Sequence, residues 1–316
     1  MRVLVVTNLQ PDEETPQRGR WVRDQIGEIR RRGVEVELFS FPIGKKEYIP
    51  ATRRLRALLG GARFDLVHAH YGLAGWCARL AGADPLIVTF HGTDVRHRLV
   101  GPLSRRLARR TDLAAGVSRA LFSPEGGRPG LPLVHGRSAV LPCGPDLDRF
   151  RPRARLEARA ELGLDPHRPY LLFPADPSRR EKRHDRALEL AGACGAELVS
   201  GGGIDPERMP LWVNAANAVL VTSDYEGFGL ACLESLACDV PVLSTPVGIA
   251  PLALRGIDGC HCADYDRRGW AAAAAPLLET PERRVVGVRR AQAFSAGRMA
   301  ERVIEAYRAT LGNDWV

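Results

Sequence analysis

The chain has 316 residues, enough for two ordinary domains, and its hydrophobic (45%) and charged (26%) fractions are those of a globular protein. No apolar run approaches the length of a membrane span, and the N-terminal segment turns polar too soon for a secretion signal. We therefore expect a cytoplasmic protein. Seven scattered cysteines, an odd number, favour reduced thiols over a disulfide framework.

The formal net charge is +8, and arginine supplies nearly all of the positive charge. Lysine occurs only at Lys45, Lys46 and Lys182. A second basic feature is a helical pattern at residues 99–110, where one face is expected to carry Arg105, Arg106, Arg109 and Arg110. Such a helix can lie on an anionic membrane at its inner face, or it can be a solvated face over the core. The sequence leaves both interpretations open, and we expect no nucleic-acid partner.

Strand-like and helix-like segments alternate along the first half of the chain. A helix is predicted at residues 21–32, where Gly33 ends it. Apolar runs predict strands at residues 3–6, 34–41, 65–69, 85–90, 113–117 and 139–141. This alternation indicates βα units around a parallel sheet.

Residues 148–169 are polar, arginine-rich and interrupted by prolines, and we interpret them as an interdomain connection. The alternation then restarts, with strands expected at 170–173, 197–199, 218–221 and 240–244 and helices at 184–195, 209–216, 270–278, 281–294 and 299–311. The predicted fold class is α/β, with two Rossmann-like doubly wound domains facing a central cleft. The expected domains are residues 1–152 and 168–295, with a C-terminal helix in residues 296–316 that packs back on the first domain.

The most informative segment is residues 226–234, where two glutamates bracket a glycine-containing loop and the start of a short helix. A helix start presents unpaired N–H groups and the positive end of the helix dipole, which together favour an anion. Glu226 and Glu234 add a carboxylate at each end, and Leu230 begins the apolar stripe of the helix. We interpret the segment as a site for a ligand with both phosphate and sugar hydroxyls. On its own, the pair is also compatible with two solvated glutamates.

Two further features suit a phosphate ligand. Arg179 and Lys182 follow the carboxyl end of the strand predicted at 170–173, where doubly wound sheets bind their ligands. An arginine fork and a lysine point charge fit a diphosphate. Gly19 precedes the helix at 21–32 and would let a phosphate approach that helix start. A solvated basic loop and an ordinary loop glycine are the alternatives.

Three histidines lie at the ends of predicted strands. His68 and His70 share one face of the strand at 65–69, and His91 follows the strand at 85–90. Histidines in this pattern could bind zinc, which would suggest a metal-dependent hydrolase. Buried, hydrogen-bonded histidines are the alternative. The sequence has no dinucleotide fingerprint after a strand, no P-loop and no nucleophile elbow, so these three enzyme classes are not expected.

Several segments, taken in order, resemble the retaining glycosyltransferases of family 4, which have the two-domain GT-B fold. The similar segments are residues 1–8, 19–25, 65–72, 91–95, 116–118, 140–150, 209–216, 226–234 and 241–245. The resemblance implies that residues 1–152 form the acceptor-side domain and residues 168–295 bind a nucleotide sugar. It also implies transfer with retained anomeric configuration, without a metal or any cofactor beyond the nucleotide-sugar donor.

The resemblance also implies roles for single residues. Glu234 would hold the ribose hydroxyls of the donor, and Glu226 would contact the transferred sugar. The rest of the donor site would comprise Gly19, Arg179, Lys182, Gly227, Phe228, Gly229 and Leu230. The catalytic residues would be His91, Glu226, Lys182 and Arg179, with His91 near the reacting sugar carbon.

This chain departs from the family pattern in three places. Residues 175–183 replace the usual glycine-containing stretch, which leaves open whether Arg179 or Arg180 is the diphosphate arginine. Residues 201–208 are abbreviated, so the base of the donor (UDP or GDP) is not assigned. Cys143 stands where an asparagine is usual.

The acceptor could be a glycan, a lipid-linked sugar in polysaccharide biosynthesis, or a small molecule. A nucleotide-sugar epimerase, a non-catalytic nucleotide-sugar-binding protein and the zinc hydrolase remain alternatives.

Overall fold

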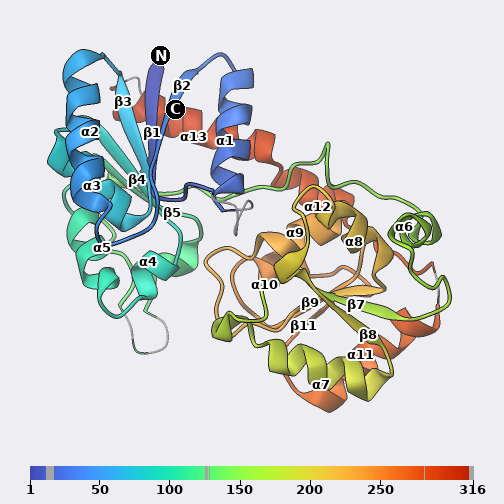
Figure 1. Ribbon diagram of the computed structural model, residues 1–316. Coiled ribbons are helices and arrows are strands. Elements are labelled where there is room, and N and C mark those ends of the chain that lie inside the picture. The colour runs from blue at the N-terminus through green and yellow to red at the C-terminus, as the bar shows by residue number, and fades with distance from the viewer. Residues whose placement is uncertain (12–17, 125–126, 128, 281, 313–316) are drawn as a thin grey trace. The chain divides into compact units, whose positions relative to one another are not determined.

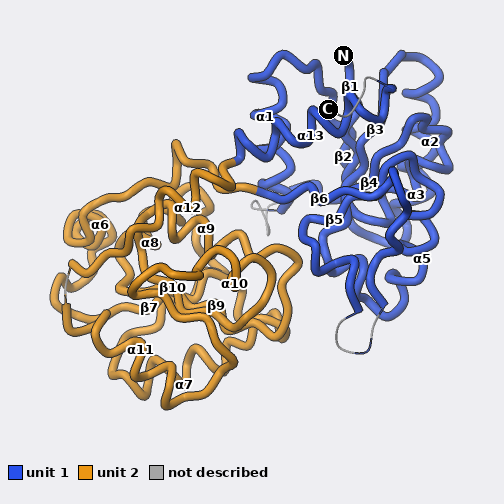
Figure 2. Tube along the Cα trace, turned by 180° about the vertical axis from the view of Figure 1, so that it is seen from behind, with its two compact units in different colours: residues 1–143, 296–316 blue, residues 144–295 orange. Residues whose placement is uncertain are grey.

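The computed structural model describes residues 1–11, 18–124, 127, 129–280 and 282–312. The chain divides into two compact units (Figure 2): unit 1 comprises Met1–Cys143 and Ala296–Val316, and unit 2 comprises Gly144–Ser295. In the part of the chain described, no helix combines the length and the apolar character that membrane crossing demands.

Unit 1 is built on a six-stranded parallel sheet with the strand order β2-β1-β3-β4-β5-β6. Its strands are β1 (Arg2–Thr7), β2 (Glu35–Ser40), β3 (Leu66–His70), β4 (Leu86–Phe90), β5 (Leu113–Gly116) and β6 (Ser138–Val140). The central strands β3, β4 and β5 are buried along their whole length, as expected for a sheet with helices on both faces.

The helices of unit 1 cover both faces of this sheet (Figure 1). On one face, α1 (Arg20–Arg31) and α13 (Ala296–Thr310) pack together and bury an apolar stripe against β1, β3 and β4. On the other face lie α2 (Tyr48–Gly61), α3 (Gly72–Ala81) and α5 (Val100–Ala108). The short helices α4 (Thr93–Arg96) and Arg119–Phe122 follow strands β4 and β5. The last long helix of the chain therefore completes the core of unit 1.

Unit 2 is built on a five-stranded parallel sheet with the order β11-β10-β9-β7-β8. The strands are β7 (Tyr170–Phe173), β8 (Glu197–Ser200), β9 (Ala218–Val221), β10 (Val242–Ser244) and β11 (His261–Cys262). Helices α7 (His184–Cys194) and α11 (Arg267–Glu279) bury Leu190 and Trp270 against one face. The opposite face carries α8 (Met209–Ala215), α9 (Leu230–Ala237) and α12 (Val288–Ala293) (Figure 1). The remaining helices are α6 (Arg155–Leu162), α10 (Ala250–Ala253) and the 3₁₀ turns Arg180–Lys182 and Gly201–Gly203.

Two parallel-sheet α/β units confirm the predicted fold class, but the segment expected as an interdomain connection is not one. Unit 2 begins at Gly144, and residues 148–169 contain α6. Arg155 and Arg159 of α6 are almost completely buried. Their guanidinium groups donate hydrogen bonds to the carbonyl oxygens of Ala216 and Ala215 at the end of α8, at 3.1 and 3.0 Å. Because backbone carbonyls satisfy the arginines, a segment that is polar in sequence packs as part of the unit.

Two other expectations need correction. The basic helix ends at Ala108, so Arg109 and Arg110 lie beyond it and do not share a helical face with Arg105 and Arg106. The helix expected at 281–294 is shorter, because α12 begins only at Val288; residue 281 itself lies outside the described residues.

Candidate functional site

The candidate donor site of unit 2 lies at the point where the direction of strand progression reverses. From β7 the chain moves outward on one side to β8, and it then returns to the other side of β7 with β9. Ligands of doubly wound sheets bind beyond the carboxyl ends of the strands at such a point. Lys182 follows β7 and Glu226 follows β9, so the sheet topology brings these two distant residues to the same edge.

Lys182 and Glu226 form a close ion pair. The Lys182 Nζ atom lies 2.7 Å from Oε1 and 2.6 Å from Oε2 of Glu226, and each side chain is only 12% exposed. Ser223 donates a hydrogen bond to Oε1 of Glu226 at 2.7 Å. The sequence assigned the lysine to the diphosphate and the glutamate to the sugar. The structure brings the two together as one charged pair, and it adds Ser223, which the sequence interpretation missed.

Hydrogen bonds join the loops that carry this pair. The Thr222 hydroxyl donates to the carbonyl oxygens of Lys182 and Arg183, both at 3.0 Å. The Asp224 N–H donates to the carbonyl oxygen of Glu181 at 2.9 Å. Polar residues directly after a buried strand were the available sequence signal for Thr222 and Ser223. These bonds fix the position of Lys182 relative to Glu226 before any ligand binds.

The start of α9 lies next to Glu226. Gly229 is the N-cap residue, and no side chain caps the helix or places an acid in its first turn. The first N–H groups of a helix have no intrahelical acceptor, so this end can receive an anion. Gly227, Phe228 and Leu230 belong to the same turn, and Glu234 is half-buried one turn further along.

Gly248 supports this turn from the neighbouring loop. It has a positive φ of 55°, and a Cβ atom there would clash with the carbonyl oxygen of Phe228. That oxygen accepts a hydrogen bond of 2.6 Å from the Ile249 N–H. A residue with a side chain at position 248 would therefore displace the loop that leads into α9.

The two candidate diphosphate arginines are both exposed. Arg179 pairs with Glu181 at 2.6 Å, and both side chains are substantially solvent-accessible. Arg180 starts the 3₁₀ turn that contains Lys182. The structure keeps both arginines on the segment after β7.

In unit 1, His68, His70 and His91 form a histidine cluster at the carboxyl ends of β3 and β4. His68 is fully buried: its Nδ1 atom lies 2.8 Å from the Tyr307 hydroxyl and its Nε2 atom 2.8 Å from Oγ1 of Thr89. Burial lowers the pKa of His68 to about 3 and places those of His70 and His91 well below the ordinary value. The three rings are therefore neutral at pH 7.

The bond between the other two rings determines which nitrogen of His91 can donate. Nδ1 of His70 and Nε2 of His91 are 3.2 Å apart, and Nε2 of His70 is buried without a partner among the described residues. An unpaired buried N–H is rarer than an unpaired acceptor. We assign the tautomer that leaves no buried N–H unpaired: His70 carries its proton on Nδ1 and donates to His91, and the proton of His91 is then on Nδ1. His91 can then donate a hydrogen bond to a ligand oxygen.

Gly19 and Trp21 complete the start of α1. Gly19 has a φ of 65°, and a Cβ atom there would clash with the carbonyl oxygen of Leu9. The Trp21 ring packs against His91, with ring centroids 4.1 Å apart. This contact places the first turn of α1 beside the histidine cluster.

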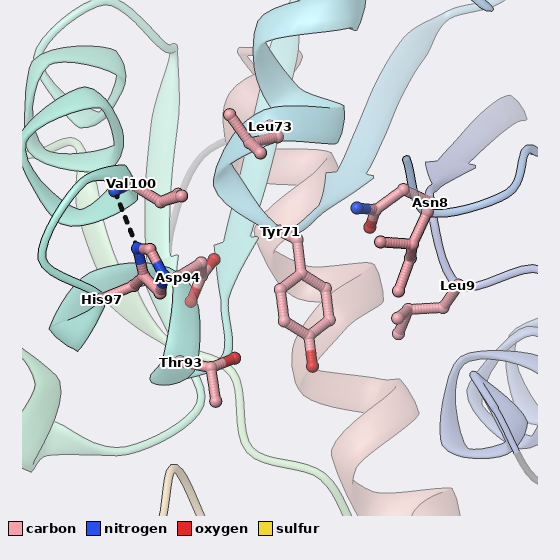
Figure 3. Close-up of a pocket in the computed structure, with 9 residues that line it drawn as sticks. Asn8, Leu9, Tyr71, Leu73, Thr93, Asp94, His97 and Val100 are labelled. Atoms are coloured by element: carbon pink, nitrogen blue, oxygen red, sulfur yellow. Dashed lines mark hydrogen bonds between the residues drawn. The ribbon is translucent and has the colours of Figure 1, made fainter. Parts of the chain in front are cut away.

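A pocket of about 270 Å³ opens beside this cluster in unit 1 (Figure 3). It is lined by Asn8, Leu9, Ile43, Tyr71, Leu73, Thr93, Asp94, His97 and Val100. Asp94 is buried, and its carboxylate accepts hydrogen bonds from the N–H groups of Gly72, His91 and Gly92 at 2.9 to 3.0 Å. Burial outweighs these bonds and raises the pKa of Asp94 to about 6. The sequence interpretation did not assign a role to any of these pocket residues.

The geometry does not support the zinc site. Both ring nitrogens of His68 are occupied by hydroxyl partners, and His70 and His91 bond to each other. In the described ranges, no group of three or more histidine, cysteine, aspartate or glutamate residues is placed to hold a metal ion. The alternative of buried, hydrogen-bonded histidines is the one found for His68.

Comparison with known proteins supports the family resemblance that the sequence indicated. The family model described as Glycosyltransferase Family 4 matches residues 1–149, and the model described as Glycosyl transferases group 1 matches residues 177–280. A D-inositol 3-phosphate glycosyltransferase of Nocardia farcinica is 32% identical, with 78% of this chain and 67% of that protein covered. One of Actinosynnema mirum is 29% identical, with 88% of each chain covered.

Solved structures with the same fold share little sequence. Sucrose-phosphate synthase from Thermosynechococcus elongatus superposes with a TM-score of 0.74 at 19% identity, covering 99% of both chains. Anabaena HepE in complex with UDP and glucose gives a TM-score of 0.70 at 16% identity, covering 97% of this chain and 99% of that one. These likenesses confirm the GT-B fold class. Together with the matched family models and the Nocardia relative, they show that the chain is a glycosyltransferase and belongs to glycosyltransferase family 4.

Proposed function

We propose that this enzyme transfers a sugar from a nucleotide-sugar donor to a hydroxyl group of an acceptor, with retention of anomeric configuration and without a metal ion. The observation that carries the proposal is the Lys182–Glu226 pair beside the uncapped start of α9. It combines a cation and N–H donors for a diphosphate with a carboxylate for sugar hydroxyls.

Each part of the donor has a proposed partner in unit 2. Lys182, with Arg179 or Arg180, neutralises the diphosphate. Glu226 accepts hydrogen bonds from hydroxyls of the transferred sugar, and the N–H groups of Gly227, Phe228, Gly229 and Leu230 lie next to the sugar and the diphosphate. Glu234, half-buried on α9, accepts from the ribose hydroxyls. UDP is the first nucleotide to test, because HepE was solved with UDP and glucose.

The pairing of Lys182 with Glu226 has a mechanistic consequence. Without a donor, the lysine charge is balanced by the carboxylate. A bound diphosphate would share or replace that carboxylate as the partner of Lys182, which would leave Glu226 lone pairs for the sugar. Glu226 therefore acts as a sugar contact in this proposal, not as a covalent nucleophile.

The proposed reaction breaks the bond between the anomeric carbon and the diphosphate oxygen, and the diphosphate keeps the electron pair. The acceptor oxygen forms its bond on the face that the diphosphate leaves, and its proton passes to the departing diphosphate oxygen. Preorganised positive groups lower the energy of the charge that develops on the leaving group. Lys182 and the start of α9 supply them in unit 2. Gly19 at the start of α1, and the Nδ1–H of His91, are the unit 1 groups to which we assign diphosphate and substrate contacts.

A membrane-proximal acceptor is the second part of the proposal. Leu99 and Leu103 are 74% and 44% exposed, and exposed Arg98 and Arg106 lie beside them. Apolar and basic side chains on one short segment can contact an anionic bilayer. The protein should co-sediment with phosphatidylglycerol vesicles and should not co-sediment with phosphatidylcholine vesicles. Equal co-sedimentation of the protein with both kinds of vesicle would contradict the electrostatic contact.

The donor assignment can be tested by a thermal-shift screen of UDP-, GDP- and ADP-sugars, because a ligand that binds only the folded protein raises its melting temperature. The donor found is then titrated by calorimetry into Glu234→Ala, with Glu161→Ala on α6 as a control of equal charge change. We expect strongly weakened binding in the first variant only.

NMR of the product tests whether the anomeric configuration is retained, and an inverted anomeric centre would exclude the mechanism.

A further inference from the structure

The pocket of unit 1 has mainly apolar walls. Leu9, Ile43, Leu73 and Val100 line it together with the ring of Tyr71, and its volume is about 270 Å³. In Figure 3, the side chains of Asn8 and Leu9 lie across from those of His97 and Val100, with Tyr71 between them. A space of this size fits one group of a ligand, since pockets for whole drug-sized ligands run from about 300 Å³ upward.

No cation faces the pocket among its described lining residues. Its acid, Asp94, is 5% exposed and is held by three backbone N–H groups. Nδ1 of His97 accepts hydrogen bonds from the N–H groups of Leu99 and Val100, both at 3.2 Å. A phosphate in this pocket would meet apolar walls and a carboxylate, with no partner for its charge.

Asn8 provides one unsatisfied polar group at the pocket wall. Asn8 is 7% exposed, and its Nδ2 atom donates to the Tyr48 hydroxyl at 3.2 Å. Its Oδ1 atom is buried and has no hydrogen-bond partner among the described residues. A buried acceptor without a partner is costly, and a ligand hydroxyl would satisfy it once the Asn8 side chain turns toward the pocket.

We propose that this pocket binds the acceptor, and that the acceptor is a neutral, hydroxyl-bearing molecule with an apolar group, distinct from the phosphorylated inositol in the names of the curated relatives. The apolar group contacts Leu73 and Val100, and a hydroxyl donates to Oδ1 of Asn8. The assignment of this ligand as acceptor rests on the proposed sugar transfer. The preference of the pocket for a neutral ligand with an apolar group does not depend on that transfer.

The preference can be measured by calorimetry with three probes: n-hexyl β-D-glucopyranoside, methyl β-D-glucopyranoside and D-inositol 3-phosphate. Burial of each methylene contributes about 0.8 kcal/mol, so even partial burial of the longer chain should make the hexyl glucoside bind at least about tenfold tighter than the methyl glucoside. D-inositol 3-phosphate should bind no tighter than the methyl glucoside.

Matched variants locate the binding site. Val100→Asp places a charge in the apolar wall and should abolish the advantage of the hexyl glucoside. Leu80→Asp makes the same change at an exposed leucine of α3 outside the pocket lining and should retain it. Ile43→Lys, at a 53% exposed wall position, should weaken hexyl glucoside binding and strengthen D-inositol 3-phosphate binding several-fold. Circular dichroism and thermal unfolding of each variant establish that it is folded.

The outcomes separate this inference from the proposed function. Equal binding of the hexyl and methyl glucosides, tighter binding of D-inositol 3-phosphate, or equal losses in Val100→Asp and Leu80→Asp would each overturn the inference, even if UDP binds. A hexyl preference that is lost only in Val100→Asp supports it. If that preference is found but no sugar nucleotide binds, the inference about the pocket is supported and the proposed sugar transfer is contradicted.

Discussion

Replacing Glu226 by glutamine tests the proposed charge balance of the donor site. Both carboxylate oxygens lie 2.6 to 2.7 Å from Nζ of Lys182, and the pair is largely shielded from solvent. In Glu226→Gln, the lysine loses its anionic partner while a neutral side chain of the same size remains. A nucleoside diphosphate would then meet an unbalanced cation, so we expect it to bind more tightly.

The magnitude follows from the geometry. Because a charge-assisted N–O contact is about 2.8 Å, a phosphate oxygen on the far side of Lys182 would lie about 5.5 Å from the carboxylate. Two unit charges at that distance repel by about 0.8 kcal/mol in bulk water and about 3 kcal/mol at an effective dielectric constant of 20. Looser positioning of the lysine offsets part of this gain. Since about 1.4 kcal/mol corresponds to a factor of ten, we expect UDP to bind roughly tenfold more tightly.

Calorimetric titration of UDP and GDP at low ionic strength measures this change. Glu161→Gln is the matched control, because Glu161 of α6 pairs with Arg153 at 2.8 Å and its loss changes the net charge by the same amount. Turnover of Glu226→Gln should fall, since the sugar contact is lost. Unchanged or weaker UDP binding would refute the reasoning, and an equal gain in Glu161→Gln would assign the effect to net charge.

Three further predictions concern turnover, pH and loop geometry. Lys182→Ala should lower kcat by about 100-fold or more, as loss of a transition-state charge partner does, and full activity would exclude that role. Below pH 6.5 the histidine cluster should destabilise unit 1, because the histidine pKa values are lower in the folded than in the unfolded chain, which therefore takes up the protons. Urea unfolding should show a loss of unfolding free energy of up to about 1.4 kcal/mol per histidine per pH unit, partly offset below about pH 6 by proton uptake at native Asp94. A stability that does not change from pH 7 to 5 would contradict this. Gly248→Ala should lower the unfolding free energy by about 1 to 3 kcal/mol and weaken donor binding, because the new Cβ atom would displace the Phe228 carbonyl. A variant as stable as the unmodified protein and with the same donor affinity would contradict the clash.

The sequence by itself determined the α/β architecture and the elements of the candidate donor site. Continuous apolar runs alternating with amphipathic helices admit few arrangements other than parallel sheets covered on both faces, and nearly every strand was predicted within two residues. The segment from Glu226 to Glu234 was recognisable because a glycine-containing loop before a helix is a local feature. Local patterns are readable in sequence because the residues that form them are neighbours.

Only the tertiary structure decided which side chains meet. Lys182 and Glu226 become partners because β7 and β9 are adjacent in the sheet, which spacing along the chain does not reveal. His68 is satisfied by Tyr307, 239 residues away, so its role in the core could not be inferred from strand position. Arg155 and Arg159 looked like linker residues because their carbonyl partners lie on another helix. Hydrogen bonding and burial of these polar groups depend on long-range contacts, and such contacts exist only in the folded chain.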